Sequence, residues 1–263
     1  MVSASTAESK DVDSVGSPNG NNVTKVEISG DGGEFVILGN KKYYRHEIMS
    51  VLAHNAQSSS SKFASSTPLG LCAFAITTLV LSLYLLQARG IKTINVAVSL
   101  ATFYGGVVQT IAGIWVFFSG DTLIFTALTS YGAFWLSFAA INIPTFGILA
   151  AYQKDMTQLS SALAFYLIAW AILSFIFMLL TFKSTVLLSG FFLCLTALFS
   201  LLSASYFVGS VALTKAAGAF GVIAVVAALY DTFALLATKQ NSYFTLPVIP
   251  LPGSEAKQRN SKG

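Results

Sequence analysis

The chain alternates long apolar runs with short polar junctions. Six of the runs contain no Asp, Glu, Lys or Arg, and a helix of about 20 apolar residues is enough to cross a hydrocarbon core about 30 Å thick. In chain order the runs are Phe63 to Ala88, Thr93 to Gly120, Thr122 to Gln153, Met156 to Phe182, Ser184 to Thr214 and Ala216 to Tyr230. The last run has to continue past Asp231 to reach that length. The pattern predicts six transmembrane helices.

Helices are also what a lipid environment requires of these runs. Backbone amides cannot stay unpaired in hydrocarbon, and the alternating pattern of a membrane barrel is absent from the sequence. Hydrophobic residues make up 54% of the 263 residues and charged residues only 10%, whereas charged residues make up about 25% of a soluble domain. The sequence therefore predicts an all-α, polytopic membrane protein.

An even number of helices puts both ends of the transmembrane domain on one side of the membrane. The cations next to the helices favour the cytoplasm for that side. It carries Lys62, Lys183, Lys239, Lys257, Arg259 and Lys262, against Arg89, Lys92, Lys154 and Lys215 opposite. We therefore expect a cytoplasmic N-terminal tail at residues 1–62, a transmembrane domain at 63–243 and a cytoplasmic C-terminal tail at 244–263.

The N-terminal tail is rich in Ser, Gly, Asn and Asp, a composition typical of disordered segments. Residues 34–54 are an exception. They begin with a short strand-like run, continue with a Gly-Asn turn and end in a predicted amphipathic helix. Such a segment lies on the membrane or caps the helices; the alternative is local nascent structure only.

Polar side chains in the first predicted helix gather on one face. Phe74, Thr77 and Thr78 share this face because residues three or four apart are neighbours on a helix. The hydroxyls of the two threonines either bond back to the helix or face a water-filled path. The pattern alone favours packing over a path.

The second predicted helix has a row with four-residue spacing, formed by Gly105, Gln109 and Gly113. Small residues so spaced let two helices approach closely, as in the GxxxG motif. Gln109 in that row is either an interhelical hydrogen-bonding group or a donor that lines a pore. The packing interpretation is slightly favoured.

Aromatic residues dominate the third and fifth predicted helices. Tyr131 and Trp135 lie one turn apart on one face, where a tyrosine ring closes a narrow passage or simply packs in the core. The fifth helix carries an apolar stripe with no polar member, which reads as core or as lipid-facing surface. The stripe consists of Phe191, Phe192, Leu195, Leu198 and Phe199.

Asp231 differs in kind from these positions. A carboxylate at bilayer depth costs about 3 kcal/mol and is normally paired or functional. It lies near the end of the last helix and is followed by Lys239, so a role at the helix end is the alternative. The two cysteines, Cys72 and Cys194, fall in separate helices and indicate neither a disulfide nor a metal site.

Several motifs in this order resemble the acetate uptake transporter family, in particular its fungal acetate/ammonia branch. They run through about two thirds of the chain. The motifs are Pro68-Leu69-Gly70-Leu71 with Phe74 and Thr77-Thr78, Phe103-Tyr104-Gly105-Gly106 with Gln109 and Ala112-Gly113, Ser130-Tyr131-Gly132 with Phe134-Trp135-Leu136, Lys183-Ser184-Thr185, Ala217-Gly218, and Gln240-Asn241-Ser242-Tyr243.

The resemblance implies six helices per subunit, a homo-hexamer and one substrate path through each protomer. It also implies an apolar constriction formed by one Phe, one Tyr and one Leu, which by motif are Phe74, Tyr131 and Leu195. The residues expected along the path are Thr77, Thr78, Tyr104, Gln109, Ser130 and Trp135.

Two positions depart from the family pattern. The family signature begins Asn-Pro-Ala, where this chain has Ser65-Ser66-Thr67 before Pro68. The loss of an amide and of a proline changes the hydrogen bonding and the stiffness at the start of the first helix. Many members also carry a Glu where this chain has Val116.

The function implied by the resemblance is plasma-membrane passage of acetate and related short monocarboxylates. The entry of an anion against an inside-negative potential costs about 2.3 kcal/mol per charge for each 100 mV. We therefore expect proton co-transport, with Asp231 as the candidate proton carrier, or passage as the neutral acid. The alternatives are ammonia export and a non-transporting sensor or scaffold.

An enzyme is not expected, and neither is a cofactor, a metal or a nucleic-acid partner. An intramembrane aspartyl protease needs two carboxylates and a metalloprotease needs His ligands. Asp231 is a single carboxylate, and both histidines, His46 and His54, fall in the N-terminal tail.

Overall fold

The structure is a computed structural model that describes residues 26–29, 33–38, 41–50 and 64–252. The chain divides into two units, residues 1–62 and 63–263. Parts of the expected tails lie outside the described residues. These parts are residues 1–25 of the N-terminal tail, residues 51–54 at the end of the predicted amphipathic helix, and residues 253–263 of the C-terminal tail.

The N-terminal unit contains an antiparallel sheet in the order β1 (Val26–Ser29), β2 (Phe35–Leu38) and β3 (Lys41–Tyr44). The strand expected after Glu34 is β2. Residues 41–44 form a third strand where a helix was expected, and residues 45–50 are helical. Tyr44 pairs with Phe35 across the sheet, with ring centroids 4.7 Å apart. Cross-strand aromatic pairs of this kind favour a strand here.

Six helices of the second unit are long and apolar enough to cross a membrane, as the sequence predicted. The first is α2 (Thr67–Leu85). The second span combines α3 (Asn95–Thr102), the π-helical turn η2 (Phe103–Val108), α4 (Gln109–Val116) and η3 (Phe117–Ser119). The others are α5 (Thr122–Asn142), α7 (Met156–Leu180), α8 (Val186–Val208) and α9 (Val211–Leu236).

Polar residues at the junctions act as helix N-caps. The side chains of Asp121, Asp155, Thr185 and Ser210 each accept a hydrogen bond from the backbone N–H three residues later, at the starts of α5, α7, α8 and α9. These bonds satisfy amides that have no partner within the helix. The short polar junctions therefore set where each apolar run starts as a helix.

The third apolar run does not form one continuous helix. α5 ends at Asn142 because Pro144 follows, and a residue before proline avoids the helical conformation. Two short helices complete the connection, η4 (Pro144–Phe146) and α6 (Ile148–Ala151). Another short helix, η1 (Ala88–Gly90), follows α2.

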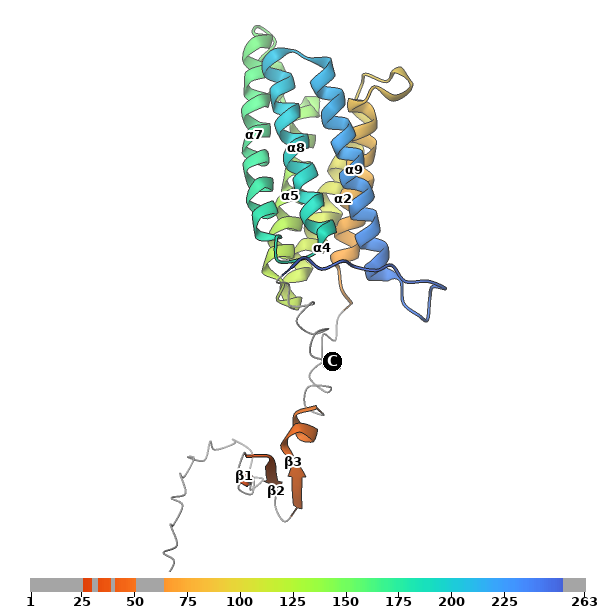
Figure 1. Ribbon diagram of the computed structural model, residues 1–263. Coiled ribbons are helices and arrows are strands. Elements are labelled where there is room, and N and C mark those ends of the chain that lie inside the picture. The colour runs from red at the N-terminus through yellow and green to blue at the C-terminus, as the bar shows by residue number, and fades with distance from the viewer. Residues whose placement is uncertain (1–25, 30–32, 39–40, 51–63, 253–263) are drawn as a thin grey trace, which may run out of the picture. The chain divides into compact units, whose positions relative to one another are not determined.

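The spanning helices form a closed ring (Figure 1). α7, α8, α9 and α2 pack side by side in that order, α2 packs against α4, and α4 packs against α5. The ring closes through hydrogen bonds from α5 to α7, between Tyr131 and Ser174 and between Ser137 and Tyr166. Aromatic side chains such as Phe74, Tyr131 and Trp135 lie inside this ring as part of the buried core.

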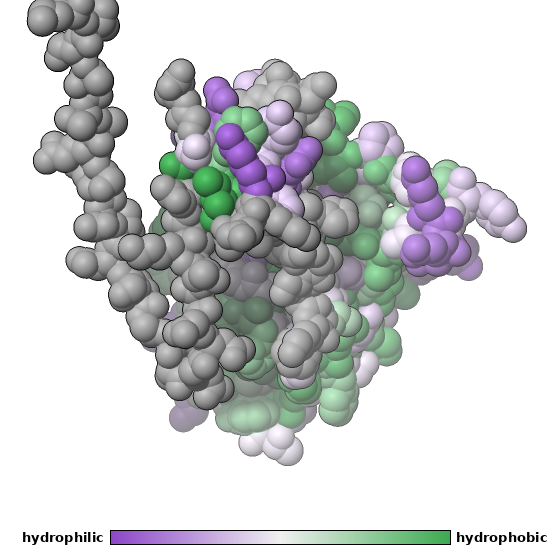
Figure 2. Space-filling view, turned by 90° about the horizontal axis from the view of Figure 1, so that it is seen from below, coloured by the Kyte–Doolittle hydropathy of each residue, from purple (hydrophilic) through white to green (hydrophobic). Residues whose placement is uncertain are grey.

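Small residues on α9 allow it to approach α2 closely. A Cβ at Gly221 would overlap Ser82 Oγ, and one at Gly218 would lie 2.9 Å from the Ser82 carbonyl oxygen. The outer faces of the helices carry large exposed apolar side chains such as Phe165, Ile172 and Ile223. Green, hydrophobic side chains dominate the flanks of the helical unit in Figure 2, as expected of a surface that faces lipid.

The segment after α9 folds back across the end of the bundle at which α2 begins (Figure 1, dark blue). Val186 N–H donates to Ile249 O at 3.0 Å, and Leu251 N–H donates to Ser184 O at 2.9 Å. The Tyr230 hydroxyl donates to Pro247 O at 2.8 Å. Residues up to 251 are therefore attached to the helices by hydrogen bonds.

Candidate functional site

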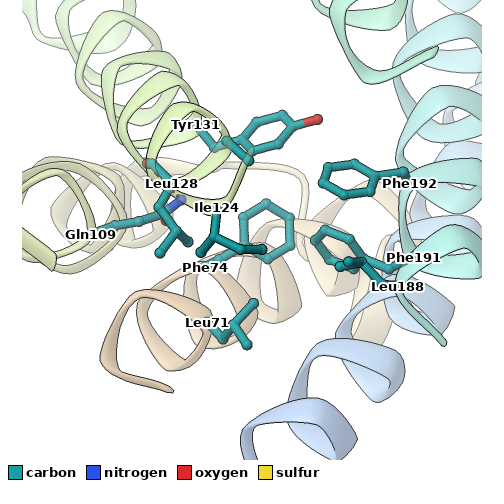
Figure 3. A pocket seen from close by; sticks show the side chains of 10 residues that line it. Leu71, Phe74, Gln109, Ile124, Leu128, Tyr131, Leu188, Phe191 and Phe192 are labelled. Atoms are coloured by element: carbon teal, nitrogen blue, oxygen red, sulfur yellow. Dashed lines mark hydrogen bonds between the residues drawn. The ribbon is translucent and has the colours of Figure 1, made fainter. Parts of the chain in front are cut away.

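A narrow apolar pocket lies inside the ring of helices (Figure 3). About 20 Å³ of it is open to the centre of a water molecule, which is room for about one water. Side chains of α2, α4, α5 and α8 line it: Leu71, Phe74, Gln109, Ile124, Ala127, Leu128, Tyr131, Leu188, Phe191 and Phe192. Every spanning helix except α7 and α9 contributes to this lining.

Aromatic rings close the pocket towards the middle of the bundle. Phe74 meets Tyr131 edge to face with ring centroids 5.8 Å apart, and it meets Phe191 in the same way at 5.2 Å. Tyr131 also stacks on Phe192 at 6.4 Å. All four side chains are at most 5% exposed. Two of the three residues predicted for the constriction, Phe74 and Tyr131, are thus brought into contact.

Leu195, the third predicted constriction residue, does not line the pocket. It is 1% exposed and belongs to the same buried cluster. It lies one turn further along α8 than Phe191 and Phe192, so it belongs to the layer beyond the rings. The sequence treated Phe191 and Phe192 as ordinary packing, and the structure places both beside Phe74.

Polar side chains follow one helical turn beyond the rings on two of the walls. On α2, Thr77 and Thr78 come one turn after Phe74, and on α5, Trp135 comes one turn after Tyr131. All three are at most 3% exposed. In the described part of the chain, Thr77 Oγ1, Thr78 Oγ1 and Trp135 Nε1 have no hydrogen-bond partner. Buried polar atoms without a partner are rare in folded proteins, so this layer calls for an explanation.

Gly105 brings two of these groups together. A Cβ at residue 105 would lie 2.8 Å from Thr77 Oγ1 and 2.9 Å from Trp135 Cδ1. Thr77 and Trp135 therefore flank a single point, where only a glycine fits. Gly105 lies in the π-helical turn η2, and such turns often occur at functional sites.

All three positions of the predicted row, Gly105, Gln109 and Gly113, contact α5. A Cβ at Gly105 would lie 2.9 Å from Trp135 Cδ1, and one at Gly113 would lie 2.7 Å from the backbone nitrogen of Thr129. Gln109 Nε2 donates to Leu128 O of the same helix. The row therefore lies where the second span approaches α5 closely, as its spacing predicted.

Gln109 has the helix-linking role, one of the two that the sequence left open. It is fully buried, and its Nε2 donates to Leu128 O on α5 at 3.4 Å, a long hydrogen bond. The side chain lines the pocket, but its Oε1 is buried and has no partner among the described residues. Gln109 therefore joins two helices.

Ser82 was missed by the sequence analysis. It lies four residues after Thr78, is 1% exposed, and its Oγ has no partner within the described ranges. The signal was present in the printed sequence as the four-residue spacing from Thr78. Ser82 faces Gly221 of α9, so it belongs to the contact between α2 and α9 and not to the layer beside Trp135.

Three other predicted site residues lie away from this cluster. Tyr104 and Ser130 are half-buried, on η2 and α5. Asp231 is half-buried on α9, does not line the pocket, and has no ion-pair or hydrogen-bond partner within the residues described. The structure therefore does not bring Asp231 together with the aromatic rings.

The first departure from the family pattern falls at the contact between α2 and α4, and the second is a buried position of α4. Ser66 Oγ donates to Ala112 O of α4 at 2.8 Å, a hydrogen bond that a proline side chain does not make. Val116, one turn after Ala112, is 2% exposed and packs as an apolar residue. Both positions therefore contribute to helix packing.

The site as a whole combines an apolar pocket, a closure of aromatic rings and a layer of free polar atoms. A hydrated ion cannot pass rings in contact without losing its water. A small, dehydrated solute that enters the polar layer finds hydroxyl and indole N–H groups with no other partner. This order of groups is typical of a selective path rather than of a catalytic centre.

Comparison with known proteins agrees with this description. Residues 50–253 match the GPR1/FUN34/yaaH family. Ammonia transport outward protein 2 of Saccharomyces cerevisiae is 42% identical over 89% of this chain and 84% of its own length. Acetate permease A of Emericella nidulans is 40% identical over 73% of this chain and 68% of its own length.

A solved structure shows the same fold. The bacterial acetate channel SatP superimposes with a TM-score of 0.63 and 31% sequence identity, over 71% of this chain and 99% of the channel. The family match covers most of the chain, and the described helices agree with it. The chain is therefore a multi-pass membrane protein that belongs to the GPR1/FUN34/yaaH family.

Proposed function

We propose that the chain conducts acetate and related short monocarboxylates through a path inside each protomer. Phe74 and Tyr131 form the constriction, with Leu195 in the next layer. The observation that carries this proposal is the layer of free donors directly beyond the aromatic closure. The printed names of an acetate permease and an acetate channel among the relatives support the choice of solute.

The free polar atoms suit a carboxylate. Leaving a buried hydroxyl or N–H without a partner costs about 1–3 kcal/mol each. Thr77, Thr78 and Trp135 each carry such an atom among the described residues. A carboxylate that enters accepts hydrogen bonds from them and offsets its own lost hydration. Size is selected at the rings, where the side chains have to separate for each passage.

Charge balance requires more than a path. An inside-negative potential opposes anion entry by about 2.3 kcal/mol per 100 mV. Net uptake therefore proceeds with a proton or as the neutral acid. Asp231 is the only carboxylate within the described spanning helices, so it is the candidate if a side chain carries the proton.

The proposal extends to the location, assembly and orientation of the protein. We place the protein in the plasma membrane as a homo-hexamer, with both tails in the cytoplasm. The cation bias supports the orientation. Residues 64 and 252 belong to the same end of the bundle, since α2 begins there and the segment after α9 folds back across it.

Purified protein in proteoliposomes tests the proposal. We expect uptake of labelled acetate that increases with an imposed inward proton gradient and that is absent from protein-free vesicles. No acetate flux above the empty-vesicle rate would contradict the proposal. That result would favour a non-transporting sensor or scaffold, whose phenotype depends on the N-terminal tail.

Ammonia export is the second candidate, and one observation favours it. A relative that is 42% identical carries the name ammonia transport outward protein 2. An apolar constriction also passes a small neutral molecule without an ion-binding site. The same vesicles, loaded with ammonium and monitored for the pH change caused by ammonia efflux, separate the two solutes.

A further inference from the structure

A hydrogen bond ties the hydroxyl of the constriction tyrosine to α7. Tyr131 OH and Ser174 Oγ lie 2.9 Å apart, and Ser174 is fully buried. The phenol oxygen points away from the pocket, towards the helix on its far side (Figure 3). What Tyr131 presents to the pocket is therefore the ring.

The direction of this hydrogen bond follows from its neighbours. Ser174 Oγ also lies 2.7 Å from Trp170 O, one turn earlier in α7. A serine has a single hydroxyl proton, and a carbonyl oxygen only accepts. The proton of Ser174 therefore goes to Trp170 O, and Tyr131 donates to Ser174. The phenol proton is then not free for a carboxylate in the path.

We infer that Ser174 is a positioning residue of the constriction. It fixes the hydroxyl end of Tyr131, holds the ring across the path and keeps the phenol from binding the permeating anion. This inference rests on the proposed function and adds a residue outside the pocket lining. It also implies that Tyr131 selects by ring size rather than by hydrogen bonding.

The surrounding rings do not fix Tyr131 by themselves. Phe177, Phe192 and Phe199 lie around it with ring centroids 6.0 to 6.5 Å away. Such contacts hold over a range of tilts, because offset and edge-to-face arrangements are both favourable. A hydrogen bond is directional, so the bond to Ser174 is what specifies one tilt.

The joint between α5 and α7 makes this bond effective. Tyr166 OH also bonds across the same boundary, since it lies 2.7 Å from Ser137 Oγ and 3.3 Å from Phe134 O. α5 is thus linked to α7 at two levels. Removing the Ser174 hydroxyl leaves the hydrogen bonding of Tyr166 in place, so the expected effect is local to the Tyr131 ring.

Ser174→Ala tests the inference, with Ser203→Ala as the matched control. Ser203 is 2% exposed and its Oγ donates to Ala164 O of α7 at 2.8 Å, so it too makes a buried interhelical hydrogen bond, but it has no contact with Tyr131. Both variants should lose similar thermal stability. Labelled acetate and lactate uptake are measured in proteoliposomes for each.

We expect Ser174→Ala to raise the ratio of lactate to acetate uptake by about fivefold or more, a change in selectivity that lost stability alone does not produce. Ser203→Ala should leave the ratio unchanged. Tyr131→Phe should raise it similarly, and the double variant should add nothing further, because both changes break the same bond. Ser174→Thr, which keeps a hydroxyl, should restore the wild-type ratio.

Three outcomes overturn the inference. The first is an equal ratio of lactate to acetate uptake for Ser174→Ala and Ser203→Ala. The second is a double variant in which the effects of Ser174→Ala and Tyr131→Phe on this ratio multiply. If wild-type protein conducts acetate and either result is found, only the inference fails. If wild-type protein conducts no acetate, the proposed function fails and the inference fails with it.

Discussion

Phe74 and Tyr131 meet edge to face, with ring centroids 5.8 Å apart and ring planes at 61°. They belong to α2 and α5, which lie on different sides of the pocket. Edge-to-face pairs contribute about 0.5–1.5 kcal/mol beyond their burial. The rings are therefore in contact across the proposed path, and each passage would require them to separate.

Phe74→Ala should admit larger solutes, because it removes one of the two rings. We expect lactate uptake relative to acetate to rise about tenfold, at a stability cost of about 3–5 kcal/mol. Leu195→Ala should act in the same direction with a smaller effect. The measurement is dual-label uptake in proteoliposomes. Phe165→Ala, at a side chain 64% exposed on α7, is the control and should behave as wild type. A lactate-to-acetate ratio that is unchanged in both Phe74→Ala and Leu195→Ala would contradict the assignment of the constriction.

Thr77→Val should stabilise the fold and slow transport. Valine keeps the shape of threonine and removes a buried hydroxyl that has no partner among the described residues. We expect a higher melting temperature in detergent and acetate uptake lower by about fivefold, because one hydrogen bond contributes about 1 kcal/mol. Thr232→Val is the matched control, since Thr232 Oγ1 donates within its own helix to Ala228 O at 2.8 Å. Wild-type uptake by Thr77→Val would remove this hydroxyl from the path.

Gly105→Ala should obstruct the polar layer. The new methyl group would lie within 3 Å of both Thr77 and Trp135, so these side chains have to move into the path. We expect acetate uptake to fall by about tenfold, with the protein still folded, since a clash of this size costs about 1–3 kcal/mol. Gly190→Ala on α8 is the control, because a Cβ there meets nothing within 4 Å. Equal uptake by the two variants would contradict the prediction.

Asp231→Asn tests the route of the proton. We expect the variant to lose the acceleration of acetate uptake by an inward proton gradient and to keep acetate exchange without a gradient. Asp121→Asn removes a charge outside the spanning helices and keeps an N-cap of equal quality, so it serves as the control. If Asp231→Asn is still accelerated, the solute passes as the neutral acid and Asp231 has no part in the coupling.

The number and type of the spanning helices could be read from the sequence, because apolar length alone decides them. Asp121, Asp155 and Ser210 mark junctions, and in the structure they are the caps of the next helix. The prediction that the last helix continues past Asp231 is confirmed, since α9 ends at Leu236. Burial in lipid leaves few alternatives for such runs.

Details that depend on packing could not be read in this way. The π-helical turn at Phe103–Val108 places Gly105 beside both Thr77 and Trp135, and the local sequence does not predict this turn. Ser174 is a single hydroxyl in an apolar helix, and only its distance from Tyr131 gives it a role. The pattern alone favoured packing for Thr77 and Thr78, and only the family resemblance put them along the path, because a pattern cannot show whether a hydroxyl has a partner. Three-dimensional contacts decide each of these points.

The first and last spanning helices, α2 and α9, pack against each other and complete the ring. During membrane insertion α2 enters the bilayer long before α9 has been synthesised, since chains emerge from the N-terminus. Until then the face of α2 with Ser82 lacks its cover. A chain that stops before Val211 would form a bundle with an open seam. The proposed path would therefore be enclosed last in the biogenesis of this protein.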